Sequence, residues 1–169
     1  MAVANTKSTI VTNADADPKK FNAKLIAGGV LKEAVGTVEV AAADDDDSVY
    51  RFCRVHSSWR PSQLQIASDA ITGGTDFDIG LHDIAATNSG AVVDADLFAS
   101  AVDLSSASAL TDRLYEATAT NISKIEKAIW ELLALASDPG KFYDLTATGN
   151  TVGTAAGTIA VALRYTDGD

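Results

Sequence analysis

The run from Thr75 to Asp83 constrains the fold most, because apolar and polar side chains alternate along it. Its apolar residues, which share one face, are Phe77, Ile79 and Leu81. The polar residues of the opposite face are Asp76, Asp78 and His82. A period of two residues is typical of a β-strand with one buried face and one solvated face. We therefore expect a strand over 75–83 with a core side and a wet side.

The same alternation recurs along most of the chain. It predicts further strands at about 37–40, 49–55, 63–70, 142–148 and 158–165. In the second of these, Val49, Cys53 and Val55 fall on one face, and Tyr50 and Phe52 fall on the other, which indicates a central strand covered on both sides. Residues 92–102 could be a strand or irregular, and 113–117 form a plausible short strand, although a helix over 104–120 stays open.

One segment has helical spacing instead. Six apolar residues between 122 and 137 form a single stripe: Ile122, Ile125, Ile129, Leu132, Leu133 and Ala136. Ser123 and Glu126 have the spacing of a capping box, and Asp138-Pro139-Gly140 would end the helix. Seven or eight short strands with one helix predict a mainly β protein, a jelly-roll-like antiparallel β-sandwich with one amphipathic helix.

The N-terminal part differs from the rest. Residues 1–33 hold few large apolar side chains, a charged turn at Asp15–Lys20 and a flexible break at Gly28-Gly29. This segment could be a disordered tail or an extended arm that becomes ordered on a partner. We predict an N-terminal arm over 1–33 and a β-sandwich domain over 34–169.

The charge of the chain limits its partners. Thirteen basic and 23 acidic residues give a formal net charge of −10. That balance disfavours nucleic-acid binding and docking on anionic membranes, both of which need a basic surface. Cys53 is the single cysteine, so no intrachain disulfide can form. The first residues lack the pattern of a signal peptide and no apolar run approaches a membrane span, so we expect a protein made in a cytosol.

Several acidic groups could carry chemistry, but each has a simpler structural interpretation. Asp44–Asp47 could bind Ca²⁺, although the four consecutive carboxylates lack the spacing of a calcium loop and favour a solvated turn. Asp76 and Asp78 could form a glycosidase pair, and Asp94 and Asp96 another. A polar outer face is the interpretation we favour for both pairs, because aromatic residues are scarce around them.

The remaining candidates are histidine, cysteine and glycine residues. Cys53, His56 and His82 lack zinc-site spacing, and Cys53 and His56 would diverge from opposite faces of one strand. The pairs Gly28-Gly29 and Gly73-Gly74 lack the pattern of phosphate loops and predict turns. We therefore expect no catalytic, cofactor-binding or metal-binding residues and no cofactor.

Parts of the sequence resemble a family of virion proteins. The similar tracts are Glu33–Phe52, Asp69–Leu81, Gly90–Leu104, Trp130–Lys141, Gly149–Ile159 and Arg164–Gly168. Together they resemble the capsid decoration, or cement, proteins of tailed bacteriophages. The resemblance implies a jelly-roll-like structural protein that is not an enzyme, binds the exterior of the phage head and stabilises the capsid. It also implies two partners, the phage major capsid protein and further copies of the chain as a dimer or trimer. The implied location is the virion exterior, with the host cytoplasm during assembly.

Two other functions remain open from the residues. A carbohydrate-binding β-sandwich displayed on a virion would need exposed aromatic rings, for which Trp59 and Tyr50 are candidates. A hydrolase would be built on Asp76 and Asp78.

Overall fold

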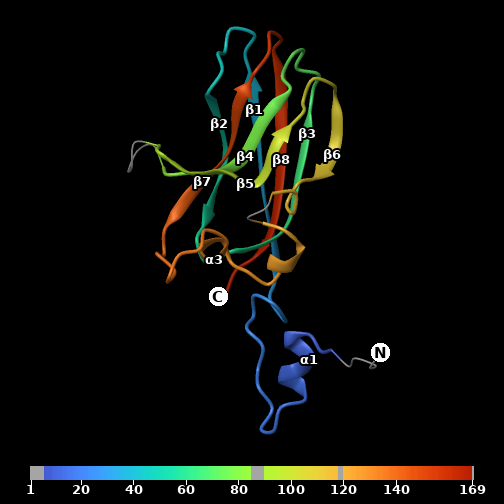
Figure 1. Cartoon of the computed structure of the whole chain (residues 1–169), viewed down its shortest axis with the longest axis vertical. Coiled ribbons are helices and arrows are strands. Elements are labelled where there is room, and N and C mark those ends of the chain that lie inside the picture. Colours follow the sequence, from blue (N-terminus) through green and yellow to red (C-terminus); the bar gives the residue numbers. More distant parts are fainter. Residues whose placement is uncertain (1–5, 85–89, 118–119, 169) are drawn as a thin grey trace, which may run out of the picture.

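The computed structural model describes residues 6–84, 90–117 and 120–168, and its main body is two facing four-stranded sheets (Figure 1). The strands are β1 (Leu31–Val40), β2 (Ser48–His56), β3 (Arg60–Ser68), β4 (Asp76–His82), β5 (Val92–Val102), β6 (Ser108–Asp112), β7 (Phe142–Thr151) and β8 (Gly157–Thr166). The helical pieces are α1 (Thr9–Ala14), the 3₁₀ turn η1 (Ile122–Lys124) and α3 (Ile129–Leu132).

The strand order is that of a jelly roll. One sheet has the order β1-β8-β3-β6 and the other β2-β7-β4-β5, with antiparallel neighbours throughout. The first strand thus pairs with the last, the second with the seventh, the third with the sixth and the fourth with the fifth. This is one long hairpin rolled up so that β8 meets β3 and β7 meets β4. The prediction of a mainly β, jelly-roll-like sandwich is confirmed.

The core lies between the two sheets, and the alternation in β4 supplies part of it. Phe77, Ile79 and Leu81 are fully buried, as the sequence predicts. They pack in one cluster with buried residues of the opposite sheet, which include Leu64, Ile66, Ile159, Val161 and Leu163. Burial of these apolar side chains supplies most of the driving force for folding.

Strand β2 departs from the predicted alternation. Its pairing with β7 shifts register between Arg51 and Cys53, so one extra residue is inserted there. Such a bulge reverses the inward and outward positions beyond it. Tyr50 and Val55 therefore both face the core, while Val49 is 36% exposed.

The region before the predicted helix also needs correction. Residues 92–102 are strand β5, and the next strand is β6 rather than a strand over 113–117. Strand β6 ends at Asp112 because its carboxylate accepts the backbone N–H groups of Leu64 and Leu114, both at 3.1 Å. These bonds turn the chain and bury Leu114.

The long helix predicted over 122–137 is wrong. The segment forms only η1 and α3, which are separate short pieces. The N–H groups of Ile129 and Trp130 donate to the carbonyls of Trp59 and Ser57, at 2.9 and 3.0 Å, and so cannot continue a helix from residues 125 and 126. Ile122 is 79% exposed, off any buried stripe.

The caps in this segment differ from the predicted ones as well. Asn121, not Ser123, caps η1 by accepting the Ser123 N–H at 3.0 Å. The Glu131 side chain accepts the Ala128 N–H at 2.9 Å and caps α3. Asp138 does not end a helix; it accepts hydrogen bonds from the Ser57 hydroxyl and the Gly140 N–H.

Residues 6–30 lie outside the sandwich, beyond one of its ends (Figure 1). We call this segment the extension; it holds α1 and a return segment. The first strand begins at Leu31, where it pairs with Thr166. Among the described residues, none of the helices has the length and hydropathy needed to cross a membrane.

Candidate interaction surface

Asp76 and Asp78, the candidate catalytic pair, are tied into the sheet by hydrogen bonds. The Asn150 side-chain amide donates to Asp76 at 3.2 Å and to Asp78 at 2.8 Å. The Ser100 hydroxyl and the Ala101 N–H also donate to Asp78, at 2.8 and 3.1 Å. Partial burial would raise the pKa of Asp78, but these hydrogen bonds outweigh it and hold the pKa below its usual value.

These bonds give Asp78 a structural role. Ala101 has a φ of 55°, a left-handed backbone conformation that alanine rarely adopts. The Asp78 carboxylate accepts the N–H of this residue and so helps hold the bend in β5. Both oxygens of Asp78 are engaged in connecting β4 with β5 and β7.

His82 lies inside the structure, which corrects its expected place on a wet face. It is 5% exposed, and its Nδ1 shares a hydrogen bond of 2.9 Å with the Thr146 hydroxyl. Burial is the main cause that lowers the pKa of His82, and the positive charge of Arg51 lowers it further, while Asp144 opposes both. The imidazole is therefore neutral at neutral pH.

Arg51 joins three segments beside His82. Its guanidinium forms an ion pair of 2.9 Å with Asp144 on β7. It also donates to the carbonyls of Asp83 and Gly90, at 3.0 and 3.1 Å. Lys141 contacts the Asp83 carboxylate at 2.8 Å. These charges are paired with one another and hold the connection between β4 and β5 at both ends.

The other predicted candidates also have structural partners. Burial raises the pKa of Asp94, and a hydrogen bond with Asp96 and the charge of that carboxylate raise it further. Burial and the charge of Asp144 raise the pKa of the Cys53 thiol to about 11, so the reactive thiolate is scarce at neutral pH. His56 bonds to the Ser58 hydroxyl at 2.7 Å. Its ring packs edge-on against Phe142.

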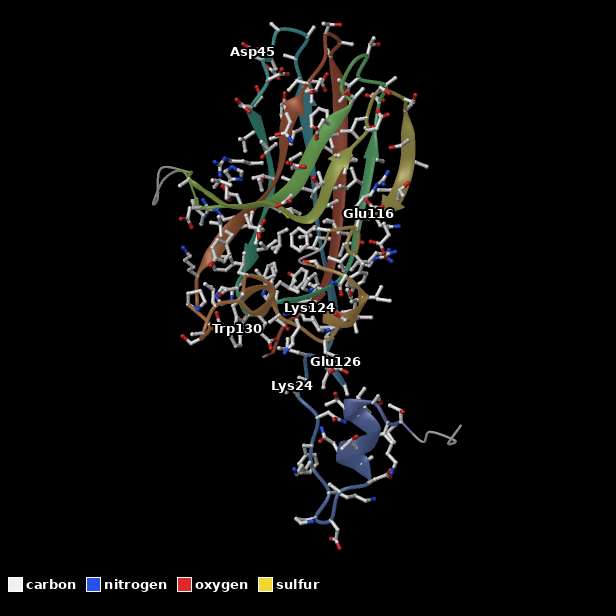
Figure 2. The ribbon with its side chains drawn as sticks, in the orientation of Figure 1. Lys24, Asp45, Glu116, Lys124, Glu126 and Trp130 are labelled. Atoms are coloured by element: carbon white, nitrogen blue, oxygen red, sulfur yellow. The ribbon has the colours of Figure 1, made fainter. Side chains whose placement is uncertain are left out.

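The acidic run at Asp44–Asp47 forms a turn, at the end of the sandwich far from the extension (Figure 2). Asp44 accepts the Ala41 N–H at 2.9 Å and the Tyr50 hydroxyl at 3.0 Å, while Asp46 accepts the Val152 N–H at 3.0 Å. The carboxylates therefore point to different partners. Within residues 6–84, 90–117 and 120–168, no group of three acidic, histidine or cysteine side chains could hold a metal ion.

The two glycine pairs lie in turns. Gly28 and Gly73 have φ values of 83° and 82°, in the left-handed region that glycine adopts without strain.

The aromatic candidates for stacking on a sugar are engaged elsewhere. Tyr50 is buried and its ring lies 6.3 Å from that of Phe77. The Trp59 indole stacks on Tyr165 at 3.8 Å between ring centres.

Exposed apolar side chains gather at the opposite end of the molecule from the acidic turn. The described residues include thirteen large apolar side chains with strong exposure, and seven of these lie in the extension or beside it: Ile10, Val11, Phe21, Val30, Leu31, Ile122 and Ile125. We call the extension, together with Leu31, Ile122 and Ile125, the docking end. Exposed apolar side chains concentrated at one end of a soluble protein are typical of an interaction site.

The extension is fastened to the sandwich. The Leu25 carbonyl accepts hydrogen bonds from Arg60 Nε and from the Thr166 hydroxyl, the latter at 3.1 Å. Nearby, the Thr9 hydroxyl donates to Glu126 at 2.9 Å. Figure 2 labels Lys24 and Glu126 at this junction. Ile10 and Ile125 line a small hollow between the two parts.

The charges of the two parts have opposite sign. Residues 1–30 contain four lysines and two aspartates, a net charge of +2. Residues 31–169 contain 9 basic and 21 acidic side chains, a net charge of −12. The docking end thus combines apolar and basic groups, whereas the body is acidic. The sequence predicts an arm over 1–33 that could become ordered on a partner, but not which of its residues would make the contact. Lys19-Lys20-Phe21, an aromatic residue beside two lysines in a polar segment, is a signal for them that is visible in the sequence.

Comparisons with known proteins find similarity in structure. Neither a protein-family model nor a curated protein matches the sequence. A chain in a solved structure titled "Capsid of Ralstonia phage GP4" superimposes with a TM-score of 0.60 and 13% identity, covering 83% of this chain and 86% of that chain. A chain of the "Cyanophage Pam1 capsid asymmetric unit" gives a TM-score of 0.41 and 17% identity, over 82% of this chain and 85% of that chain. The first likeness establishes a shared fold; the second is too weak to support an argument.

Proposed function

We propose that this chain is a structural protein of a tailed-phage virion that binds the outer surface of the head and stabilises the capsid. The observation that carries the proposal is the docking end, where seven of the thirteen exposed large apolar side chains of the described residues gather. Two further findings favour a phage head: the resemblance in sequence to capsid decoration proteins, and the fold shared with a chain from the capsid structure of Ralstonia phage GP4.

The architecture suits a protein whose work is adhesion. The polar groups that could have carried catalysis are engaged in holding strands and turns, as Asp76 and Asp78 illustrate. The jelly roll supplies a stiff body, and the acidic surface favours solubility at high copy number. A rigid body fixed to two neighbouring shell subunits would resist their separation. In this proposal the major capsid protein is the partner, and the chain works as a non-catalytic homo-oligomer on the exterior of the virion.

The proposal includes a division of the chain into an arm over residues 1–33 and a β-sandwich domain over 34–169. Leu25 lies within this arm, and its carbonyl accepts the hydrogen bonds that attach the arm to the body.

Binding to heads tests the function directly. Heads of the phage that encodes this chain, assembled without it, should bind the purified protein saturably and resist heat or osmotic rupture better afterwards. Removal of residues 1–24 should abolish binding, because it deletes α1 and Phe21 and leaves Leu25 in place to bond Arg60 and Thr166. The thermal unfolding midpoint of the truncated protein controls for its fold.

Two outcomes would count against the proposal. Heads that bind no intact protein would exclude the decoration function. Heads that bind a folded truncated protein as fully as the intact one would exclude the docking end as the contact.

A further inference from the structure

We propose that Phe21 is the anchor of the docking end and that it enters an apolar pocket on an acidic surface of the partner. Lys19, Lys20 and Lys24 would surround the pocket and pair with its acidic rim. The inference rests on the proposed function, since the partner is taken to be the shell protein of the phage head.

Among the residues that the structure describes, Phe21 is the most exposed large apolar residue. The residue has a relative exposure of 101%, so its ring is not packed against any of the described residues. Burial of a phenylalanine side chain is strongly favourable, and aromatic residues are frequent among the few side chains that dominate binding. A phenylalanine side chain that is exposed in the free protein therefore lowers the free energy of a complex in which it becomes buried.

The backbone on both sides of Phe21 is held in place. The Lys20 N–H donates to the Asn13 carbonyl at 3.1 Å. The Asn13 side-chain amide donates to the Asn22 side-chain oxygen at 2.7 Å. Both bonds connect the return segment to α1, and Phe21 lies between their attachment points. The ring is thus presented on an ordered loop, which lowers the entropy lost when it binds.

The loop in turn is fixed to the sandwich. The contacts of Leu25 with Arg60 and Thr166, and that of Thr9 with Glu126, attach the extension on its two sides. Phe21 therefore belongs to an element that is fastened to the sandwich and extends beyond one of its ends (Figure 1). These hydrogen bonds define the position of the extension relative to the two sheets before binding.

The charges identify the chemistry of the partner. Lys7 is paired with Asp15 at 2.8 Å, whereas Lys19, Lys20 and Lys24 are exposed and form no ion pair with any described residue. An acidic surface would attract these three ammonium groups and repel the acidic body. Such a partner would bind the docking end and keep the acidic body away from its surface.

Binding of full-length variants to heads that lack the protein tests the anchor. Phe21→Ala should weaken binding about 30-fold, and Phe21→Leu, which keeps an apolar side chain, should weaken it much less. Lys20→Glu should weaken binding about fivefold. The controls are Leu110→Ala, an exposed apolar residue on β6, and Arg54→Glu, an exposed charge on β2. Both controls should bind like the unaltered protein.

The outcomes separate this inference from the proposed function. If the unaltered protein does not bind heads, the proposed function fails and the anchor with it. If the unaltered protein binds and Phe21→Ala and Lys20→Glu bind equally well, the anchor alone is wrong. Light scattering of the free protein tests whether Phe21 binds a second copy of this chain. If Phe21→Ala reduces self-association and leaves head binding unchanged, the pocket belongs to a second copy of this chain, which also overturns the inference.

Discussion

At the scale of single residues, His82 illustrates how one buried group links stability to pH. Its imidazole is enclosed beside Arg51 on β2 and beside Asp144 and Thr146 on β7. Burial and the Arg51 charge lower its pKa in the folded protein. The unfolded chain, in which histidine has a pKa of about 6.5, therefore binds a proton over a pH range in which the folded protein does not.

The free energy of unfolding should consequently fall as the pH decreases below about 6.5, through the range down to the lowered pKa of His82. The slope for this one proton is at most about 1.4 kcal/mol per pH unit. Urea unfolding at pH 7.5 and 5.5 measures the change, and His82→Gln should reduce the loss between the two values. An equal loss in the variant would show that another group causes it.

The residues of β4 show what an alternating sequence pattern can and cannot predict. Alternation correctly placed Phe77, Ile79 and Leu81 in the core, because the period of two belongs to the strand itself. It placed His82 on a wet face, and this was wrong. The opposite face of β4 is covered near Gly80 by the backbone of β5, a contact between segments that no local sequence pattern encodes.

At the scale of elements, the close approach of β5 to β4 depends on Gly80. A Cβ atom at this position would lie 2.1 Å from the Asp94 carbonyl oxygen and 2.4 Å from the backbone of Ala95. Backbone atoms cannot rotate away as the end of a side chain can. The pairing of the two strands is already irregular, with register shifts between Phe77 and His82.

Gly80→Ala should therefore destabilise the protein by about 3 kcal/mol, the upper part of the range for overpacking. Gly140→Ala is the control: Gly140 has a φ of 62°, but a Cβ there would meet nothing within 4 Å, so the cost should be about 1 kcal/mol. Equilibrium urea unfolding of both variants measures the difference. Equal losses would mean that β5 moves aside at little cost.

The segment 122–137 shows the same limit for a whole element. The apolar spacing that predicted one helix is present, and Ile129 and Leu132 are indeed buried. The segment breaks because the Ile129 and Trp130 N–H groups bind the carbonyls of the β2–β3 connection. A hydrogen bond to a distant segment thus replaces one within the helix. Likewise, the segment containing Phe21 gave a visible signal, but its exposure depends on how the extension folds on Asn13.

At the scale of the whole molecule, charge is divided between the two ends. The body carries a net charge of −12 and the extension +2. Salt should therefore stabilise the body and weaken the binding of the extension to an acidic partner. Screening shortens the range of electrostatic interactions from about 10 Å at 0.1 M to about 3 Å at 1 M salt. Repulsion among the acidic groups destabilises the compact body, whereas attraction between the lysines and an acidic shell would favour binding.

Raising NaCl from 0.1 to 1 M should therefore increase the thermal unfolding midpoint and weaken binding to heads by on the order of tenfold. Differential scanning calorimetry and a head-binding assay measure the two effects on the same protein. Lys20→Glu removes part of the attraction, so its binding should depend less on salt, while Arg54→Glu should keep the full dependence. Binding that strengthens or stays constant with NaCl would show that the apolar contact of Phe21 acts without an acidic rim.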